Sequence, residues 1–439
     1  MRFLMTRNFP LIVAALACSG AAAFGQPANT VHLTLAQAES LAIQHHPQLL
    51  AEQNLASAFG QQVVEAKAAY YPTLAGDATG SAGNQQARIG AGMLAMSRLF
   101  DRFGTGISVN QLVTDSGRTS NLVASARFRS DAAQKDYQAT RYDILLRVNQ
   151  AYYQVLRSQA TIKVARQTVD ARQLVLDQVT ALANNKLRSQ LDVTFADVSV
   201  SQAKLLLIEA QNQEQEAFAE LTRAIGAETN AAYTLEEQSL PPSPPPEAEA
   251  LIAQALNNRP EVASLRLERD AAYRFERAER DLKLPTVSLI AVGGYIPYID
   301  QITLPRVIPG EYGGAAVNVH IPVFNGHLFS ARREEAHFRA MEADQHVRDL
   351  EQAVARDVRS AWATATTAYQ RLAVVEQLLR QATLSLDLAQ GRYQLSLSSI
   401  VELTQAQLNV TQAEIESLSA KYNYQSQYAA LQYALGTLR

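Results

Sequence analysis

The chain is poor in features on which many protein functions depend. Cysteine occurs once in 439 residues, at Cys18, within the export signal described below, which leaves the mature chain without a cysteine nucleophile. Charged residues make up 18% of the chain and the formal net charge is −3, a balance that gives no basic surface for nucleic acid. Beyond the N-terminal segment no apolar run reaches about 18 residues, so no transmembrane helix is predicted.

Catalytic and metal-binding patterns are missing as well. The seven histidines lack the spacing of a zinc site such as HExxH, and we interpret His45-His46, which precede a proline, as a helix end. Neither GxSxG nor a phosphate-binding loop occurs, and Gly90-Ala91-Gly92 indicates only a loop. We therefore predict no enzyme activity, no cofactor and no metal, with an enzyme as the weaker alternative.

An export signal is predicted at residues 1–25. Two arginines precede an apolar run and small residues follow it: Arg2, Arg7, Leu11 to Ala17, Ala21, Ala22, Ala23 and Gly25. The mature chain is expected to start near Gln26. Cys18 could instead carry a lipid, but Ala15 occupies the place where bacterial lipoprotein signals usually have leucine, so simple cleavage is favoured.

Two long helices are predicted from a heptad stripe that occurs twice. Steps of four and three residues meet only apolar side chains at Val354, Val358, Ala361, Ala365, Ala368, Leu372, Val375, Leu379, Ala382, Leu386, Ala389 and Tyr393. A spacing of 3.5 residues keeps one seam against a partner helix, as in a coiled coil. The same steps taken 210 residues earlier, from Ile144, are interrupted only by Ser158 and Arg172, so the chain is an internal duplication.

The two copies share the prolines that mark the beginnings and ends of their short helices. Helices are expected at Leu33–His45, Pro47–Tyr71, Leu251–Asn258 and Pro260–Leu284, with Pro72 and Pro285 closing the second helix of each copy. Long helices at about Thr119–Ala183 and Leu328–Gln394, each roughly 100 Å, are followed by return helices that keep the seam. We predict a first repeat at 26–226, a stiff proline-rich linker at 227–246 and a second repeat at 247–439.

Each copy also contains one predicted β-hairpin. Apolar Val317, Val319, Ile321 and Val323 alternate with polar residues, and Thr286–Tyr295 and two segments of the first copy alternate similarly. These lengths and faces suit a membrane barrel with interfacial aromatics at Tyr70, Tyr71, Tyr295, Tyr298 and Tyr312. Four strands cannot close a barrel, so other copies must supply the rest.

The duplicated plan resembles the TolC-like outer membrane efflux proteins over nearly the whole mature chain. The motifs that carry the resemblance are Leu33-Thr34-Leu35, His46-Pro47, the run from Arg392 to Leu403, and the ending Ala434-Leu435-Gly436-Thr437-Leu438. Ser396 stands where the family usually has glycine, with Lys186 at the equivalent place in the first copy.

The resemblance implies a fold class that is mainly α with a small β part. A duplicated α-barrel of long helices would continue a 12-stranded transmembrane β-barrel, to which each chain of a homotrimer gives four strands. The implied function is an outer membrane exit channel of a Gram-negative bacterium, extending into the periplasm and served by a periplasmic adaptor and an inner membrane pump. A soluble periplasmic coiled-coil scaffold is the alternative.

Two groups of residues are predicted to act at the helical tips. The turns are expected to contact the adaptor through Lys186, Leu187, Arg188, Ser189, Ser396, Leu397, Ser398 and Ser399. Asp192 and Glu402 occupy the same slot of the two copies and form the spacing of a capping box with Ser189 and Ser399. In a trimer they would also supply six carboxylates near the narrow end of the tunnel, which would favour cations.

Overall fold

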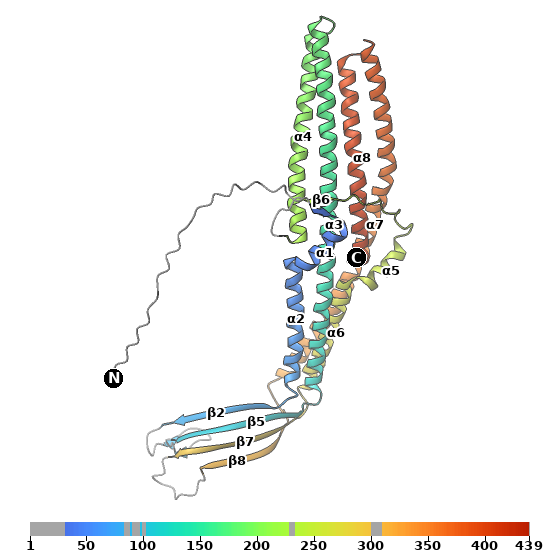
Figure 1. Cartoon of the computed structure of the whole chain (residues 1–439). Coiled ribbons are helices and arrows are strands. Elements are labelled where there is room, and N and C mark those ends of the chain that lie inside the picture. The colour runs from blue at the N-terminus through green and yellow to red at the C-terminus, as the bar shows by residue number, and fades with distance from the viewer. Residues whose placement is uncertain are drawn as a thin grey trace, which may run out of the picture.

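The computed structural model describes residues 31–82, 88–89, 97–98, 102–227, 233–299 and 310–438, so the predicted export signal lies outside the described residues. The molecule is elongated, with long helical hairpins at one end and a curved sheet at the other (Figure 1). The first copy contains β1 (Val31–Leu33), α1 (Leu35–His45), α2 (Pro47–Ala68), β2 (Thr73–Ser81), β3 (Arg88–Ile89), β4 (Ser97–Arg98), β5 (Arg102–Thr114), α3 (Arg118–Asn184) and α4 (Gln190–Ile225). After β6 (Tyr233–Leu235) the second copy contains α5 (Glu249–Asn258), α6 (Pro260–Asp281), β7 (Thr286–Ile299), β8 (Glu311–His320), α7 (Leu328–Gln394) and α8 (Ile400–Ala434).

α2 and α6 begin at Pro47 and Pro260 as predicted, whereas α1 begins at Leu35 instead of Leu33 and α5 at Glu249 instead of Leu251. Thr34 caps α1 in a complete capping box with Gln37, and α2 has Pro47 in its first turn. Leu33 was expected to open the helix, but it ends the strand β1, which pairs in parallel with β6. Because Thr34 is the N-cap with extended backbone angles, the helix begins only after it.

The predicted seams form the contacts between the long helices. Val354, Val358 and Ala365 are buried in a cluster with Leu251 and Leu431, and Ile144 and Val148 occupy the corresponding cluster of the first copy. Both long helices have 67 residues and turn back at their tips into α4 and α8. The heptad interpretation is therefore confirmed in both copies.

The two polar residues in the first seam are buried and have partners. The Ser158 hydroxyl donates to the carbonyl of Val155, one turn earlier in its own helix. Arg172, which is 4% exposed, donates from Nη1 to the carbonyl of Ser199 on α4 at 3.0 Å. Burial lowers the pKa of this guanidinium. A charged residue is thus accommodated in the seam by a backbone acceptor of the return helix.

The four long strands form one antiparallel sheet in the order β2-β5-β7-β8. The first copy supplies one side of this sheet and the second copy supplies the other, so β2 and β8 are the edges. The alternation in Val317 and Val319 lies on β8, as expected, but the strand stops at His320, short of the predicted Ile321 and Val323. Pro322 explains the end, because it has no N–H for the ladder.

The chain between the repeats crosses the helices as an extended strap. Residues 236–246 have no helix or strand. Gln425 donates to the carbonyl of Gln238, Tyr424 to that of Pro242 and Trp362 to that of Pro245. The strap is thus held against α7 and α8 along its length.

None of the helices in the described part of the chain is long and apolar enough to cross a membrane.

Candidate functional site

Both helical tips turn through a left-handed residue. Lys186 and Ser396 have φ angles of 63° and 62°, a conformation that costs a side chain about 1–2 kcal/mol. The amide of Leu187 donates to the carbonyl of Leu182, and that of Leu397 donates to Arg392, so each turn closes in the same way. Leu187 and Leu397 are 68% and 67% exposed. The turns therefore present matched apolar side chains at the far end of the helices.

Arg188 joins the two tips. Its Nη2 donates to the carbonyl of Tyr393 at 2.8 Å and to the Ser396 hydroxyl at 3.3 Å, and its guanidinium lies 4.4 Å from the centre of the Tyr393 ring. Burial raises the pKa of the Tyr393 phenol; the Arg188 cation opposes this increase and the Asp192 carboxylate adds to it. Sequence reasoning placed Arg188 among the exposed tip residues, whereas in the structure its guanidinium binds Tyr393 and Ser396 of the neighbouring hairpin.

The two tip carboxylates differ in their partners. Asp192 completes a capping box, because the Ser189 hydroxyl accepts from the Asp192 amide and the Asp192 carboxylate accepts from the Ser189 amide, both at 3.2 Å. Ser399 accepts from the Glu402 amide in the same way, but the Glu402 carboxylate pairs with Nε of Arg392 at 3.2 Å. The capping interpretation is thus correct for Asp192 and half correct for Glu402. Sequence reasoning missed Arg392 as the neutralising partner.

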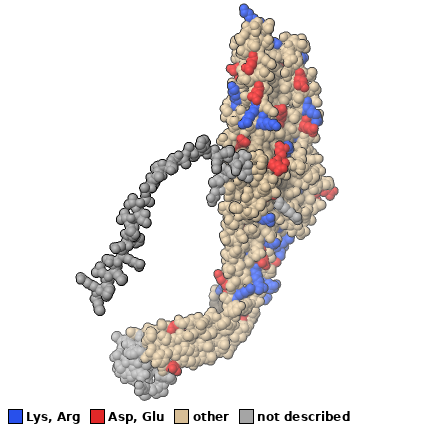
Figure 2. Space-filling model, viewed as in Figure 1, with Lys and Arg blue, Asp and Glu red and all other residues tan. Residues whose placement is uncertain are grey.

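The two faces of the sheet differ in polarity. Because side chains alternate along a strand, residues paired across strands share a face. Leu74, Ile107, Val109 and Leu289 lie on one face, which is mainly apolar but also carries Thr105, Gln111 and Glu311. The opposite face is more polar: besides Leu112, Ile290 and Val292 it carries Thr73, Asp77, Thr79, Ser108, Asn110, Ser288, Asn318 and His320. In the view of Figure 2 the sheet shows few charged side chains, whereas the helices carry many.

The five predicted interfacial aromatics fall into different environments. Tyr70 and Tyr71 follow α2 at the junction of helices and sheet and are 48% and 68% exposed. Tyr295 is exposed on the apolar face of β7. Tyr298 pairs with Phe103 through its backbone, and its side chain lies outside the described part. Tyr312 shares a row with Asp77 on the polar face, a placement that does not suit lipid contact.

The described residues contain no group of three His, Cys, Asp or Glu side chains that could hold a metal ion. The polar contacts described at the tips are helix caps, the hydrogen bonds and cation–π contact of Arg188, and the exposed Arg392–Glu402 ion pair. These contacts fix the turns and join them to one another.

Comparisons with known proteins agree with the duplicated architecture. The outer membrane efflux protein family matches residues 39–227 and 251–437, one stretch in each half of the chain. The chain is 22% identical to the outer membrane protein TolC of Salmonella enteritidis over 350 residues, which cover 77% of this chain and 71% of TolC. It is 23% identical to the outer membrane efflux protein BepC of Brucella suis over 429 residues, which cover 98% and 90% of the two chains.

A solved structure shows the same fold. The outer membrane protein VceC of Vibrio cholerae superposes with a TM-score of 0.78 at 19% identity, covering 92% of this chain and 96% of VceC. The duplicated hairpins, the four-stranded sheet and the family match in both halves lead to one conclusion. The chain belongs to the outer membrane efflux protein family and is an outer membrane efflux channel.

Proposed function

We propose that three copies of this chain assemble edge to edge into one continuous conduit. The proposal rests on the exposure of β2 and β8, the two edge strands of the sheet. All ten residues of β8 are exposed, and β2 at the other edge is exposed wherever its side chains are described. An open edge is not tolerated in lipid, and a closed barrel needs about eight strands or more. Three copies would supply twelve.

Like the sheet, the layer of long helices has two exposed edges. α3 packs against α4 and α8, and α8 packs against α7, which leaves α4 and α7 as the outer helices of the layer. Each outer helix exposes an apolar row: Leu191, Phe195, Val198, Leu205 and Ile208 on α4, and Val374, Leu378 and Leu388 on α7. The steps of four, three and seven residues on α4 are those of a further heptad seam. The first copy of one chain is therefore suited to pack against the second copy of the next.

The apolar face of the sheet is the surface that would meet outer membrane lipid, and the polar face would line the conduit. Tyr70, Tyr71, Tyr295 and Tyr298 remain proposed as aromatics of the membrane interface. We leave Tyr312 out of that group because it lies on the polar face. The chain supplies a passive duct and performs no chemistry in this proposal.

The helical tips are proposed to meet a periplasmic adaptor, which links the duct to an inner membrane pump. Support comes from their position at the exposed end of the longest helices and from the apolar Leu187 and Leu397. Single cysteines at these two positions should cross-link to adaptor in the native envelope. Arg188 and Ser398 are less suitable, since Arg188 holds Tyr393 and the Ser398 hydroxyl is buried. A cysteine at Asn257 is the control, and cross-linking only from there would contradict the proposal.

Asp192 and Glu402 are proposed to make the periplasmic entrance favour cations. Because Arg392 pairs with Glu402, Asp192 should contribute more of the effect. Asp192→Asn should therefore lower the cation preference in bilayer recordings more than Glu402→Gln does. Lower thermal stability with unchanged ion preference would show that both residues act only as caps.

Solubilisation separates the conduit from the alternative, a soluble periplasmic scaffold. Membranes from cells producing the unsubstituted protein should release it only with detergent, and the purified protein should conduct ions across a planar bilayer. Release by urea without detergent, or purified protein that never conducts, would favour the scaffold.

A further inference from the structure

A single cross-strand row on the polar face of the sheet combines a carboxylate with an aromatic ring. Asp77 on β2 pairs with Gly106 on β5, Gly106 pairs with Gly294 on β7, and Gly294 pairs with Tyr312 on β8. Residues in direct register share a face, so all four lie on the polar side. The row therefore crosses the sheet from edge to edge with one residue from each strand.

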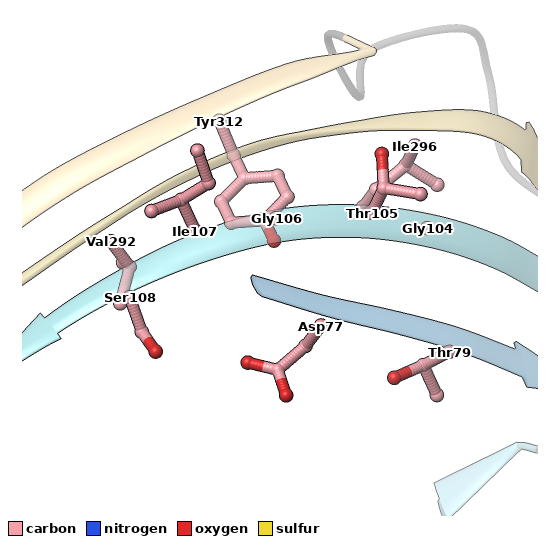
Figure 3. Close-up of a pocket in the computed structure, with 10 residues that line it drawn as sticks. All are labelled: Asp77, Thr79, Gly104, Thr105, Gly106, Ile107, Ser108, Val292, Ile296 and Tyr312. Atoms are coloured by element: carbon pink, nitrogen blue, oxygen red, sulfur yellow. The ribbon is translucent and has the colours of Figure 1, made fainter. Parts of the chain in front are cut away.

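The two glycines make room for the tyrosine. A Cβ atom on Gly294 would lie 2.5 Å from Cζ of Tyr312, and one on Gly106 would overlap the hydroxyl. The ring must therefore extend from β8 across β7 to β5, and Figure 3 shows its hydroxyl beside Gly106. One side of the ring covers glycine backbone, and the side chain is still 44% exposed. A tyrosine in this position leaves an aromatic surface open to the conduit.

Asp77 lies at the other end of the same row and is exposed. It is the only carboxylate among the described side chains of the polar face, where Tyr312 and His320 are the other titratable groups. Around the row the sheet forms a cavity of about 400 Å³, to which Thr79 and Ser108 contribute hydroxyls. Figure 3 shows Asp77, Thr79 and Ser108 with their oxygens directed to the same side.

We propose that this row is a binding site for organic cations, such as protonated or quaternary amines, on the wall of the conduit. A carboxylate supplies the opposite charge, and an open aromatic face attracts ammonium groups through its quadrupole. The inference rests on the proposed trimeric conduit, in which three such rows would bring three carboxylates and three rings to one level. Shielding of glycine backbone by the tyrosine is the purely structural explanation of the same row.

Block of ion conduction by tetraethylammonium tests the site. The purified protein and four variants are compared in planar bilayers, after native electrophoresis has shown that each keeps the assembly of the unsubstituted protein. Asp77→Asn should raise the half-blocking concentration about two- to fivefold, the range expected for one exposed charge interaction. The matched control is Glu311→Gln, which removes a carboxylate from the same sheet. Glu311 pairs with Tyr295 and so lies on the other face, and its loss should leave block unchanged.

The tyrosine is tested by two substitutions. Tyr312→Leu should weaken block about twofold or more because it removes the ring, whereas Tyr312→Phe keeps the ring and should preserve block. If Tyr312→Leu fails to assemble, the comparison of block in Asp77→Asn and Glu311→Gln still tests the site. Equal block in Asp77→Asn and the unsubstituted protein, or equal weakening in Glu311→Gln, overturns the site while the conduit stands. Absence of conduction in the unsubstituted protein overturns the proposed function itself.

Discussion

The two long hairpins have the same seam and the same length, yet their surroundings differ. Of the 67 residues in each first helix, 23 are buried in α3 and 11 in α7. The reason is position: α3 lies within the layer, against α2, α4, α6 and α8, whereas α7 is an outer helix. A heptad stripe therefore specifies one contact face of a helix. Whether the other faces are buried depends on the position of that helix in the layer.

At equivalent positions, the two copies also hold the chain that crosses the helices by side-chain hydrogen bonds, but they differ in the number of these bonds. Tyr152 and Trp362, 210 residues apart, both bond to the chain that crosses the helices. The buried Tyr152 hydroxyl lies 3.0 Å from the Leu33 carbonyl and 2.7 Å from the Glu236 carbonyl, and it accepts from the Glu236 amide. Trp362, which is half-buried, makes a single bond of 2.7 Å from its Nε1 to Pro245. The first copy thus holds the crossing chain through a more buried side chain and more hydrogen bonds than the second copy does.

The largest effect is expected from a charge placed in the second seam. Ala365 is fully buried, so Ala365→Glu should cost about 3–5 kcal/mol of stability by burying an unpaired carboxylate. Ala363→Glu is the matched control: this position is exposed in α7, although its counterpart Tyr153 is buried in α3. Urea unfolding followed by circular dichroism measures both. Equal losses would show that α7 has no distinct exposed face.

Much of this architecture follows from local patterns in the sequence. Heptad spacing predicts both hairpins, and Pro47 and Pro260 predict where two short helices begin, because proline suits the first turn of a helix. The pairing of Arg188 with Tyr393 depends on how two hairpins approach each other, and no local pattern encodes that distance. The Asp77–Tyr312 row depends on strand register between the copies, so the sequence indicated only alternation. Lys186 and Ser396 stand where the resemblance places glycine, and both adopt the positive φ angles that favour glycine.

An intermediate effect is expected at the strap contacts. Tyr152→Phe leaves a buried carbonyl and amide with fewer partners and should cost about 1–3 kcal/mol. Trp362→Phe removes one partly exposed bond and should cost about 0.5–1.5 kcal/mol. Thermal unfolding of the two variants measures the difference. A larger loss in the tryptophan variant would reverse the ranking of the two copies.

The smallest effect, and one that stabilises, is expected at the tips. Glycine adopts positive φ without the Cβ clash, so Lys186→Gly and Ser396→Gly should each stabilise their turn by about 1 kcal/mol. Hydrogen exchange of the tip amides should slow by the same amount in both copies. Lys186→Ala is the control, because alanine keeps the clash and should give no gain. A gain in only one copy would show that Arg188 has already set the geometry of the other.

The most direct test of the whole account is the number of chains in the particle extracted from the outer membrane. Native mass spectrometry of the detergent-purified protein should find three copies, since in the described part of the chain both edge strands of the sheet lack a partner and two apolar helix rows are exposed. The double variant Leu205→Cys, Leu378→Cys should then form disulfides between chains, joining α4 of one copy to α7 of the next. A single-chain particle that conducts ions would contradict the account.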